Sequence, residues 1–275
     1  MARKAKQEPK PPEVDAALTL VGQAGEPLAV FSAPVVRPLR HMVTLLAASG
    51  ALPPRLALVS ALREEGVTYT ALALATILAH DMAGAVGLVE LNWEAPGLAR
   101  LIASAAGAKS PAAGDAAAAG APAADTAAAE ASGAAQGVTG AEGGLAAVLT
   151  GRATLDDVLV WTGMPNLALL PAGELPRVGR EALVRSARLR EIIEELAGRF
   201  DHLLLDIPAV AATSDAIPLA RLGDAILLVI RQGITSRRVV AATLDDFSQC
   251  TVLGVVLNRV KVATPAWIFK LLPQD

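Results

Sequence analysis

Six short aliphatic runs constrain the fold of this 275-residue chain more than any other feature. None of them alternates cleanly between apolar and polar residues, so each predicts a strand buried on both faces, as in a parallel sheet. Helical patterns lie between several of the runs, and this predicts a doubly wound α/β fold with a mostly parallel sheet and helices on both faces. The predicted strands are 56–60, 86–91, 167–170, 203–206, 225–230 and 252–258, and the predicted helices are 34–52, 69–82, 181–198 and 237–247.

Two segments lie outside this alternation. Residues 1–33 begin with basic residues and prolines and predict a flexible N-terminal tail. Residues 104–144 are mostly small, with alanine and glycine predominating, so they lack the large apolar side chains that fill a core. We therefore expect a single domain over 34–275, interrupted by a disordered insert at 104–144. A small second domain within the insert is the less favoured alternative.

Charge and cysteine content narrow the functional class. The 24 basic and 27 acidic residues give a net charge of −3, which provides no basic field for nucleic acid. Cys250 is the only cysteine, so there is no disulfide framework and a reducing compartment fits. The N-terminus runs into prolines rather than an apolar stretch, and the longest apolar run, 71–78, is too short to span a bilayer. We expect a cytoplasmic protein that does not bind nucleic acid.

The first aliphatic run leads into the sequence ALREEGVT at 61–68, followed by a helix. A phosphate-binding P-loop, G-x-x-x-x-G-K-[ST], has this position and length. Its glycines let backbone N–H groups surround the phosphates, its lysine offsets their charge, and its hydroxyl binds Mg²⁺. Gly66 and Thr68 match the motif, whereas Ala61 replaces the first glycine and Val67 replaces the lysine.

Five further segments follow along the chain: VGLVELNWEAPGL at 86–98, GLAAVLTGRATL at 144–155, NLALLPAG at 166–173, FDHLLLDIP at 200–208 and GVVLNR at 254–259. In this order they resemble segments of the bacterial tyrosine autokinase family (BY-kinases of the CpsD/CapB type). Members of that family are cytosolic P-loop kinases of capsule and exopolysaccharide export, and they are related to the ParA/MinD ATPases. The resemblance covers about residues 34–262 and implies a P-loop NTPase-like fold of the SIMIBI type.

The resemblance implies a metal and catalytic role for several residues. Thr68 matches the hydroxyl that binds Mg²⁺, and Asp206 matches the Walker B carboxylate of the same metal site. Glu90 stands where the family has the aspartate proposed to activate the attacking hydroxyl, and Asn92 stands where it has a second aspartate of the Mg²⁺ shell. Structural alternatives stay open, because Asp206 could cap the next loop and Glu90 could be ion-paired in a pocket that binds nothing.

Other residues match the family's nucleotide-binding and assembly positions. Gly66 belongs to the loop, and Asn258 matches the amide that reads adenine. Arg37 and Arg40 match two arginines of a helix used in ring assembly, although its glutamate is replaced by Pro34. Asn258 is equally a common turn former, and the two arginines could equally form a solvated helix face.

The departures from the family pattern all weaken phosphate binding. Val67 removes the lysine charge, and Glu64 adds a negative charge beside the phosphates. Arg63 is a candidate replacement cation for nucleotide binding. The chain has a single tyrosine, Tyr69, so it lacks the C-terminal tyrosine cluster that these autokinases phosphorylate. We therefore expect a kinase-like domain whose catalytic residues are vestigial.

The leading hypothesis is a scaffold or regulator in capsular or exopolysaccharide biosynthesis or export. The expected partner is an intact paralogous kinase or the cytosolic part of a membrane polysaccharide co-polymerase, which would recruit the protein to the inner face of the membrane; a homo-oligomer also fits. We expect no cofactor, or Mg-ATP if the altered loop still binds it. Two alternatives stay open: a weakly active ATP-binding kinase or ATPase of the same family, and a ParA/MinD-like partitioning ATPase relative.

Overall fold

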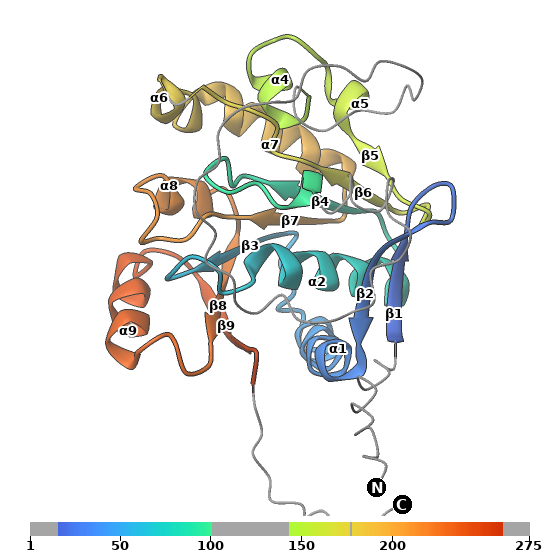
Figure 1. The fold of residues 1–275 in the computed structure, drawn as a ribbon, viewed down its shortest axis with the longest axis vertical. Helices are drawn as coiled ribbons and strands as arrows, with labels where there is room; N and C mark the ends of the chain where they lie inside the picture. Colours follow the sequence, from blue (N-terminus) through green and yellow to red (C-terminus); the bar gives the residue numbers. More distant parts are fainter. Residues whose placement is uncertain (1–15, 101–142, 177, 261–275) are drawn as a thin grey trace, which may run out of the picture.

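The computed structural model describes residues 16–100, 143–176 and 178–260 (Figure 1). A seven-stranded sheet runs through this part of the chain in the order β5-β6-β4-β7-β3-β8-β9. Six strands are parallel, and β5 pairs antiparallel with β6 at one edge. The strands are β3 Arg55–Ser60, β4 Val86–Glu90, β5 Val160–Trp161, β6 Leu167–Leu170, β7 His202–Asp206, β8 Ala225–Arg231 and β9 Val252–Asn258.

All six predicted strands are present, which confirms the predicted fold class. The interior strand β3, which lies between β7 and β8, shows why such a sequence is continuously apolar. Leu56 and Leu58 belong to one hydrophobic core, whereas Ala57 and Val59 belong to another on the opposite face of the sheet. Side chains alternate between the two faces of a strand, so a strand covered on both faces needs apolar residues at every position.

Helices cover both faces of the sheet (Figure 1). Helices α1 Ala33–Ala48 and α2 Val67–Asp81 enclose one core. The other core is enclosed by the helices that follow in the chain. These are α4 Leu145–Leu149, α5 Leu155–Val158, α6 Arg180–Val184, α7 Ala187–Arg199, α8 Ala216–Ala220 and α9 Arg237–Asp246. The short helices α4, α5 and α8 and the edge strand β5 are additions to the sequence prediction.

Residues 16–32 correct the prediction of a flexible tail over 1–33. They form an antiparallel hairpin of β1 Ala16–Val21 and β2 Pro27–Ser32. Leu18, Leu20 and Phe31 are buried there and join the core of α1 and α2. The alternating apolar residues of this segment therefore gain their burial from helices that follow later in the chain. Residues 1–15 lie outside the described residues.

Two other expectations concern the connections between elements. The predicted insert at 104–144 lies outside the described residues except for its last two glycines, and Gly144 is the N-cap residue directly before α4. The helix expected at 181–198 is divided into α6 and α7. Ser186 causes the division, because its backbone is extended and its hydroxyl caps α7 by accepting a hydrogen bond from the Leu189 N–H at 3.2 Å.

Within the described ranges, none of the helices has both the length and the apolar character needed to cross a membrane.

Candidate functional site

The candidate site lies at the carboxyl edge of the parallel strands, where α/β sheets place their ligands. The loop 61–66 connects the end of β3 to the start of α2. Strand β7 lies between β3 and β4, and its last residue, Asp206, is the register partner of both Leu58 in β3 and Glu90 in β4. The sheet therefore brings the loop, Glu90 and Asp206 to the same edge, as the sequence predicted.

Two residues of the loop have left-handed backbone conformations. Gly66 has φ +92° and precedes α2, and a Cβ at this position would lie 2.2 Å from Nδ2 of Asn258. Glu64 has φ +64°, a conformation that costs a residue with a side chain about 1–2 kcal/mol. No side chain of the described residues caps the N-terminus of α2. The loop therefore has the curled path and the uncapped helix start that suit an anion.

The loop lacks the positive charge that a phosphate would require. Val67, at the lysine position, is the first residue of α2 and is buried in the core beneath that helix. Arg63 is 57% exposed, and its Nη2 atom lies 3.7 Å from Oε2 of Glu94. Glu94 also accepts a 2.5 Å hydrogen bond from Arg180. The one basic side chain of the loop thus lies beside a carboxylate that is already paired.

A buried carboxylate holds the loop against neighbouring elements. Glu65 accepts a hydrogen bond from the Leu62 N–H at 2.8 Å, and its other oxygen accepts from the Arg231 N–H at 3.2 Å and from the Thr235 hydroxyl. Asn258, at the end of β9, donates from Nδ2 to the Glu65 carbonyl at 2.8 Å. The loop is therefore bonded both to the connection between β8 and α9 and to β9.

These contacts involve residues that the sequence analysis missed or assigned differently. Nothing local in the sequence distinguishes Glu65 and Thr235, because they are 170 positions apart. The resemblance implied that Asn258 reads adenine. In this structure its amide donates to the loop, and its Oδ1 accepts from the Arg259 N–H at 2.8 Å.

Glu90 is fully buried, and backbone groups satisfy its carboxylate. Oε1 accepts hydrogen bonds from the N–H groups of Gly97 at 2.5 Å and Leu98 at 2.8 Å, and Oε2 accepts from Ala172 at 3.1 Å. Burial raises the pKa of the Glu90 carboxyl, and these three bonds offset part of the rise. Glu90 thereby connects the end of β4 to the segment after β6.

Asp206 is also buried, but without the hydrogen bonds that Glu90 accepts. Neither of its carboxylate oxygens has a hydrogen-bond partner among the described residues. Burial, together with the adjacent charge of Glu90, raises the pKa of Asp206 to about 8, and the Thr68 side chain offsets part of the rise. A buried carboxylate without a partner at the edge of a binding loop is suited to a hard cation, which prefers oxygen ligands.

The remaining predicted residues lie around this centre or away from it. Asn92 accepts a hydrogen bond from the Ala95 N–H at 3.1 Å, which stabilises the turn after β4. Arg40 makes a bidentate ion pair with Asp81, from Nε to Oδ2 at 2.5 Å and from Nη2 to Oδ1 at 3.1 Å. Asp81 is the last of the 15 residues of α2, about 22 Å along the helix from the loop. Arg37 is exposed on α1. The structure therefore does not bring the two arginines to the loop.

The fold and the loop after β3 define a P-loop NTPase-like domain, and the comparisons with known sequences agree. No family model matches the chain. It is 32% identical over 119 residues to the tyrosine-protein kinase CpsD of Streptococcus agalactiae, a match that covers 42% of this chain and 51% of that protein. It is 32% identical over 120 residues to the succinoglycan biosynthesis transport protein ExoP of Rhizobium meliloti, covering 42% of this chain and 15% of that protein. The chain thus spans about half the length, or less, of these relatives.

Solved structures show the same fold. The kinase domain of VpsO has a TM-score of 0.65 and 23% identity, covering 83% of this chain and 95% of that domain. The septum site-determining protein MinD from Pyrococcus horikoshii, complexed with Mg-ADP, has a TM-score of 0.51 and 20% identity, covering 78% of this chain and 74% of that protein. The chain is therefore similar in sequence, over 119–120 residues, to bacterial proteins that include a tyrosine-protein kinase, and its fold is similar to that of the VpsO kinase domain and of MinD.

Proposed function

We propose that this chain is a tyrosine-kinase-like P-loop domain with impaired nucleotide chemistry, which acts as a scaffold or regulator in polysaccharide assembly or export. The observation that carries the proposal is Val67. An aliphatic side chain buried beneath α2 occupies the position of the phosphate-binding lysine. Glu64 adds a negative charge to the same loop, and Arg63 lies beside Glu94.

The expected loss of affinity is large. Removing one partner of a desolvated charge pair costs about 2–5 kcal/mol, which corresponds to about 30-fold to several-thousand-fold in a dissociation constant. Phosphoryl transfer depends almost entirely on positioning and on stabilisation of charge, so its rate should fall more than binding does.

The residues that would bind the metal are better preserved than those that would bind the phosphates. Asp206 has two unpartnered buried oxygens, and the Thr68 side chain is near enough to lower its pKa. These two residues would hold Mg²⁺, which neutralises phosphate charge when it is bound. MinD, which has a similar fold, is described with Mg-ADP. The combination supports a domain that keeps part of a nucleotide site without its phosphate-binding cation.

The relatives' names support the biological setting that we propose. ExoP is named for succinoglycan biosynthesis and transport, and CpsD is named as a tyrosine-protein kinase. This chain has one tyrosine, so it offers no tyrosine cluster of its own. We propose an intact kinase or the cytosolic part of a membrane export protein as its partner, with self-association through Arg37 and Arg40 as a further contact.

Calorimetric titration with Mg-ATP tests the proposal. We expect no saturation of the wild type up to millimolar nucleotide. The double variant Val67→Lys with Glu64→Gly restores the lysine and one glycine and should bind detectably, whereas Glu64→Gly alone should not. Circular dichroism checks that each variant is folded.

Micromolar Mg-ATP binding by the wild type would overturn the proposal. In that case the variant Arg63→Ala tests the alternative of a weakly active enzyme. Loss of Mg-ATP binding in this variant would identify Arg63 as the replacement cation.

A further inference from the structure

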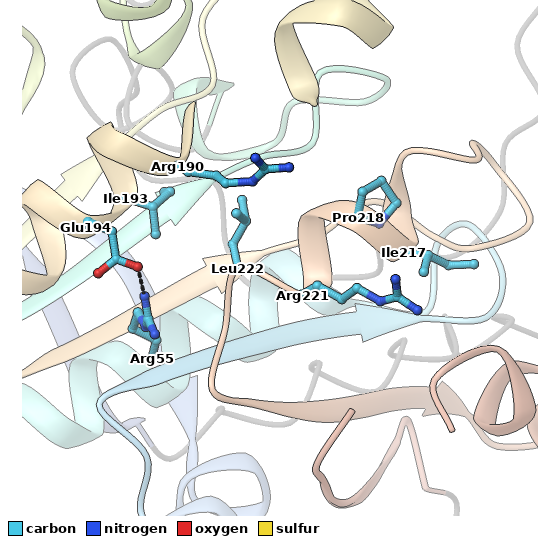
Figure 2. Close-up of a pocket in the computed structure, with 8 residues that line it drawn as sticks. All are labelled: Arg55, Arg190, Ile193, Glu194, Ile217, Pro218, Arg221 and Leu222. Atoms are coloured by element: carbon cyan, nitrogen blue, oxygen red, sulfur yellow. Dashed lines mark hydrogen bonds and ion pairs between the residues drawn. The ribbon is translucent and has the colours of Figure 1, made fainter. Parts of the chain in front are cut away.

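A groove between α7 and α8 lies outside the candidate site. It encloses about 330 Å³, within the range of small-ligand pockets. Six side chains that line it combine two arginines with four apolar residues: Arg190, Ile193, Ile217, Pro218, Arg221 and Leu222 (Figure 2). Arg55, at the first residue of β3, closes the end of the groove opposite to the sheet edge that carries the loop.

The positive charge in this groove is only partly balanced. Arg55 pairs with Asp224 at 2.6 Å and with Glu194, so these two carboxylates are already engaged. Arg190 and Arg221 are exposed, and no acidic group among the described residues pairs with either of them. Two unpaired guanidinium groups in one groove of a chain with net charge −3 favour an anionic ligand.

Apolar side chains accompany the two arginines. Figure 2 shows Leu222 between Arg190, from α7, and Arg221, from the end of α8, with Pro218 to one side. Ile193 and Ile217 also line the groove. A small anion alone would leave this surface uncovered, whereas an anionic group on an apolar stem would use both parts. The lining therefore fits an anionic group that is carried on an apolar stem.

We propose that the α7–α8 groove binds a phosphotyrosine side chain of a partner protein. The ring packs against Pro218 and Leu222, and the phosphate accepts charge-assisted hydrogen bonds from Arg190 and Arg221. The choice of phosphotyrosine rests on the proposed function, because relatives are named as tyrosine-protein kinases and phosphotyrosine is the product that such a kinase forms on a protein. The groove would allow this domain to respond to the phosphorylation state of an active kinase without catalysing transfer.

Fluorescence anisotropy with labelled peptides tests the proposal on the full chain. The probes are one peptide with a single phosphotyrosine, the same peptide with tyrosine, and the same peptide with phosphoserine. We expect saturable binding of the phosphotyrosine peptide and at least tenfold weaker binding of the other two. Arg190→Ala and Arg221→Ala should each weaken the binding of the phosphotyrosine peptide about tenfold. Arg238→Ala, the same change on α9 outside the groove, should stay within about twofold.

Equal binding of the phosphotyrosine and tyrosine peptides would overturn the proposal, as would wild-type affinity in both groove variants. Equal binding of phosphoserine would show that the apolar lining does not select the ring, and would also overturn it. No nucleotide is present in this experiment. Tight Mg-ATP binding would therefore defeat the proposed function without affecting the peptide result, and failure of the peptide to bind would defeat the groove alone.

Discussion

Glu90 and Asp206 are register partners at the ends of the parallel strands β4 and β7, and both are buried. Their surroundings differ. Three backbone N–H groups donate to Glu90, whereas neither oxygen of Asp206 has a partner among the described residues. Because the charge of Glu90 disfavours ionisation of Asp206, and Asp206 lacks such donors, Asp206 takes up a proton more readily.

The first prediction concerns pH and Asp206. Its pKa is about 8 in the folded chain, against 3.8 ordinarily. Between these values the folded state holds a proton that the unfolded state has lost, so the free energy of unfolding falls as pH rises through this window. Asp206→Asn removes the titration. We compare the free energy of unfolding of this variant with that of wild type. The difference should shift in favour of the variant by about 2 kcal/mol or more between pH 5 and pH 8.5.

Urea unfolding at the two pH values measures this difference. Asp246→Asn, the same change at an exposed site, should alter stability by less than about 0.5 kcal/mol at either pH. A constant difference between wild type and Asp206→Asn across the window would contradict the raised pKa.

The second prediction concerns the structural part played by Glu90. Glu90→Ala leaves three N–H groups without their acceptor, and each buried unpaired group costs about 1–3 kcal/mol. We expect a loss of about 3 kcal/mol or more in the free energy of unfolding, measured by urea denaturation. Glu90→Gln keeps one acceptor oxygen and should lose less. Glu191→Ala on the exposed face of α7 is the control, and a loss below about 1 kcal/mol in Glu90→Ala would refute the assignment.

The third prediction concerns backbone strain at Glu64. Its φ of +64° favours glycine, since any Cβ is strained there. Glu64→Gly should therefore be more stable than Glu64→Ala by about 1 kcal/mol, because both remove the carboxylate and only glycine relieves the strain. Glu181 in α6 provides the comparison, where glycine should be the less stable replacement. Thermal unfolding of the four variants suffices, and equal stability of the two Glu64 variants would show that the loop is unstrained.

Local pattern was enough to predict much of the fold. Each aliphatic run of the sheet carries its own signal, since a strand covered on both faces must be apolar throughout, and all six runs form parallel strands. The position of the loop followed for the same reason, because the segment 61–68 lies between a recognisable strand and a recognisable helix. The sequence match to a tyrosine-protein kinase supports the resemblance that the five motifs indicated by their order along the chain.

Contacts between distant parts of the chain were beyond this kind of prediction. The sequence predicts a tail where the hairpin β1–β2 forms, because Leu20 and Phe31 are buried in a core that they share with α1, α2 and the sheet, all of which follow later in the chain. The hydrogen bonds of Glu65 to Thr235 and of Asn258 to the loop depend on the order of β3, β8 and β9 in the sheet.

For the site, the sequence by itself determined which side chains are present: valine where a lysine binds phosphate, and acids at 90 and 206. Only the tertiary structure decided the burial, the hydrogen bonds and therefore the pKa of the two acids. Glu90 and Asp206 are both acids at strand ends, and nothing in their local sequence says that one accepts three hydrogen bonds and the other none. Burial and hydrogen-bond partners come from neighbouring strands and loops, so the charge that each acid carries is a property of the folded chain.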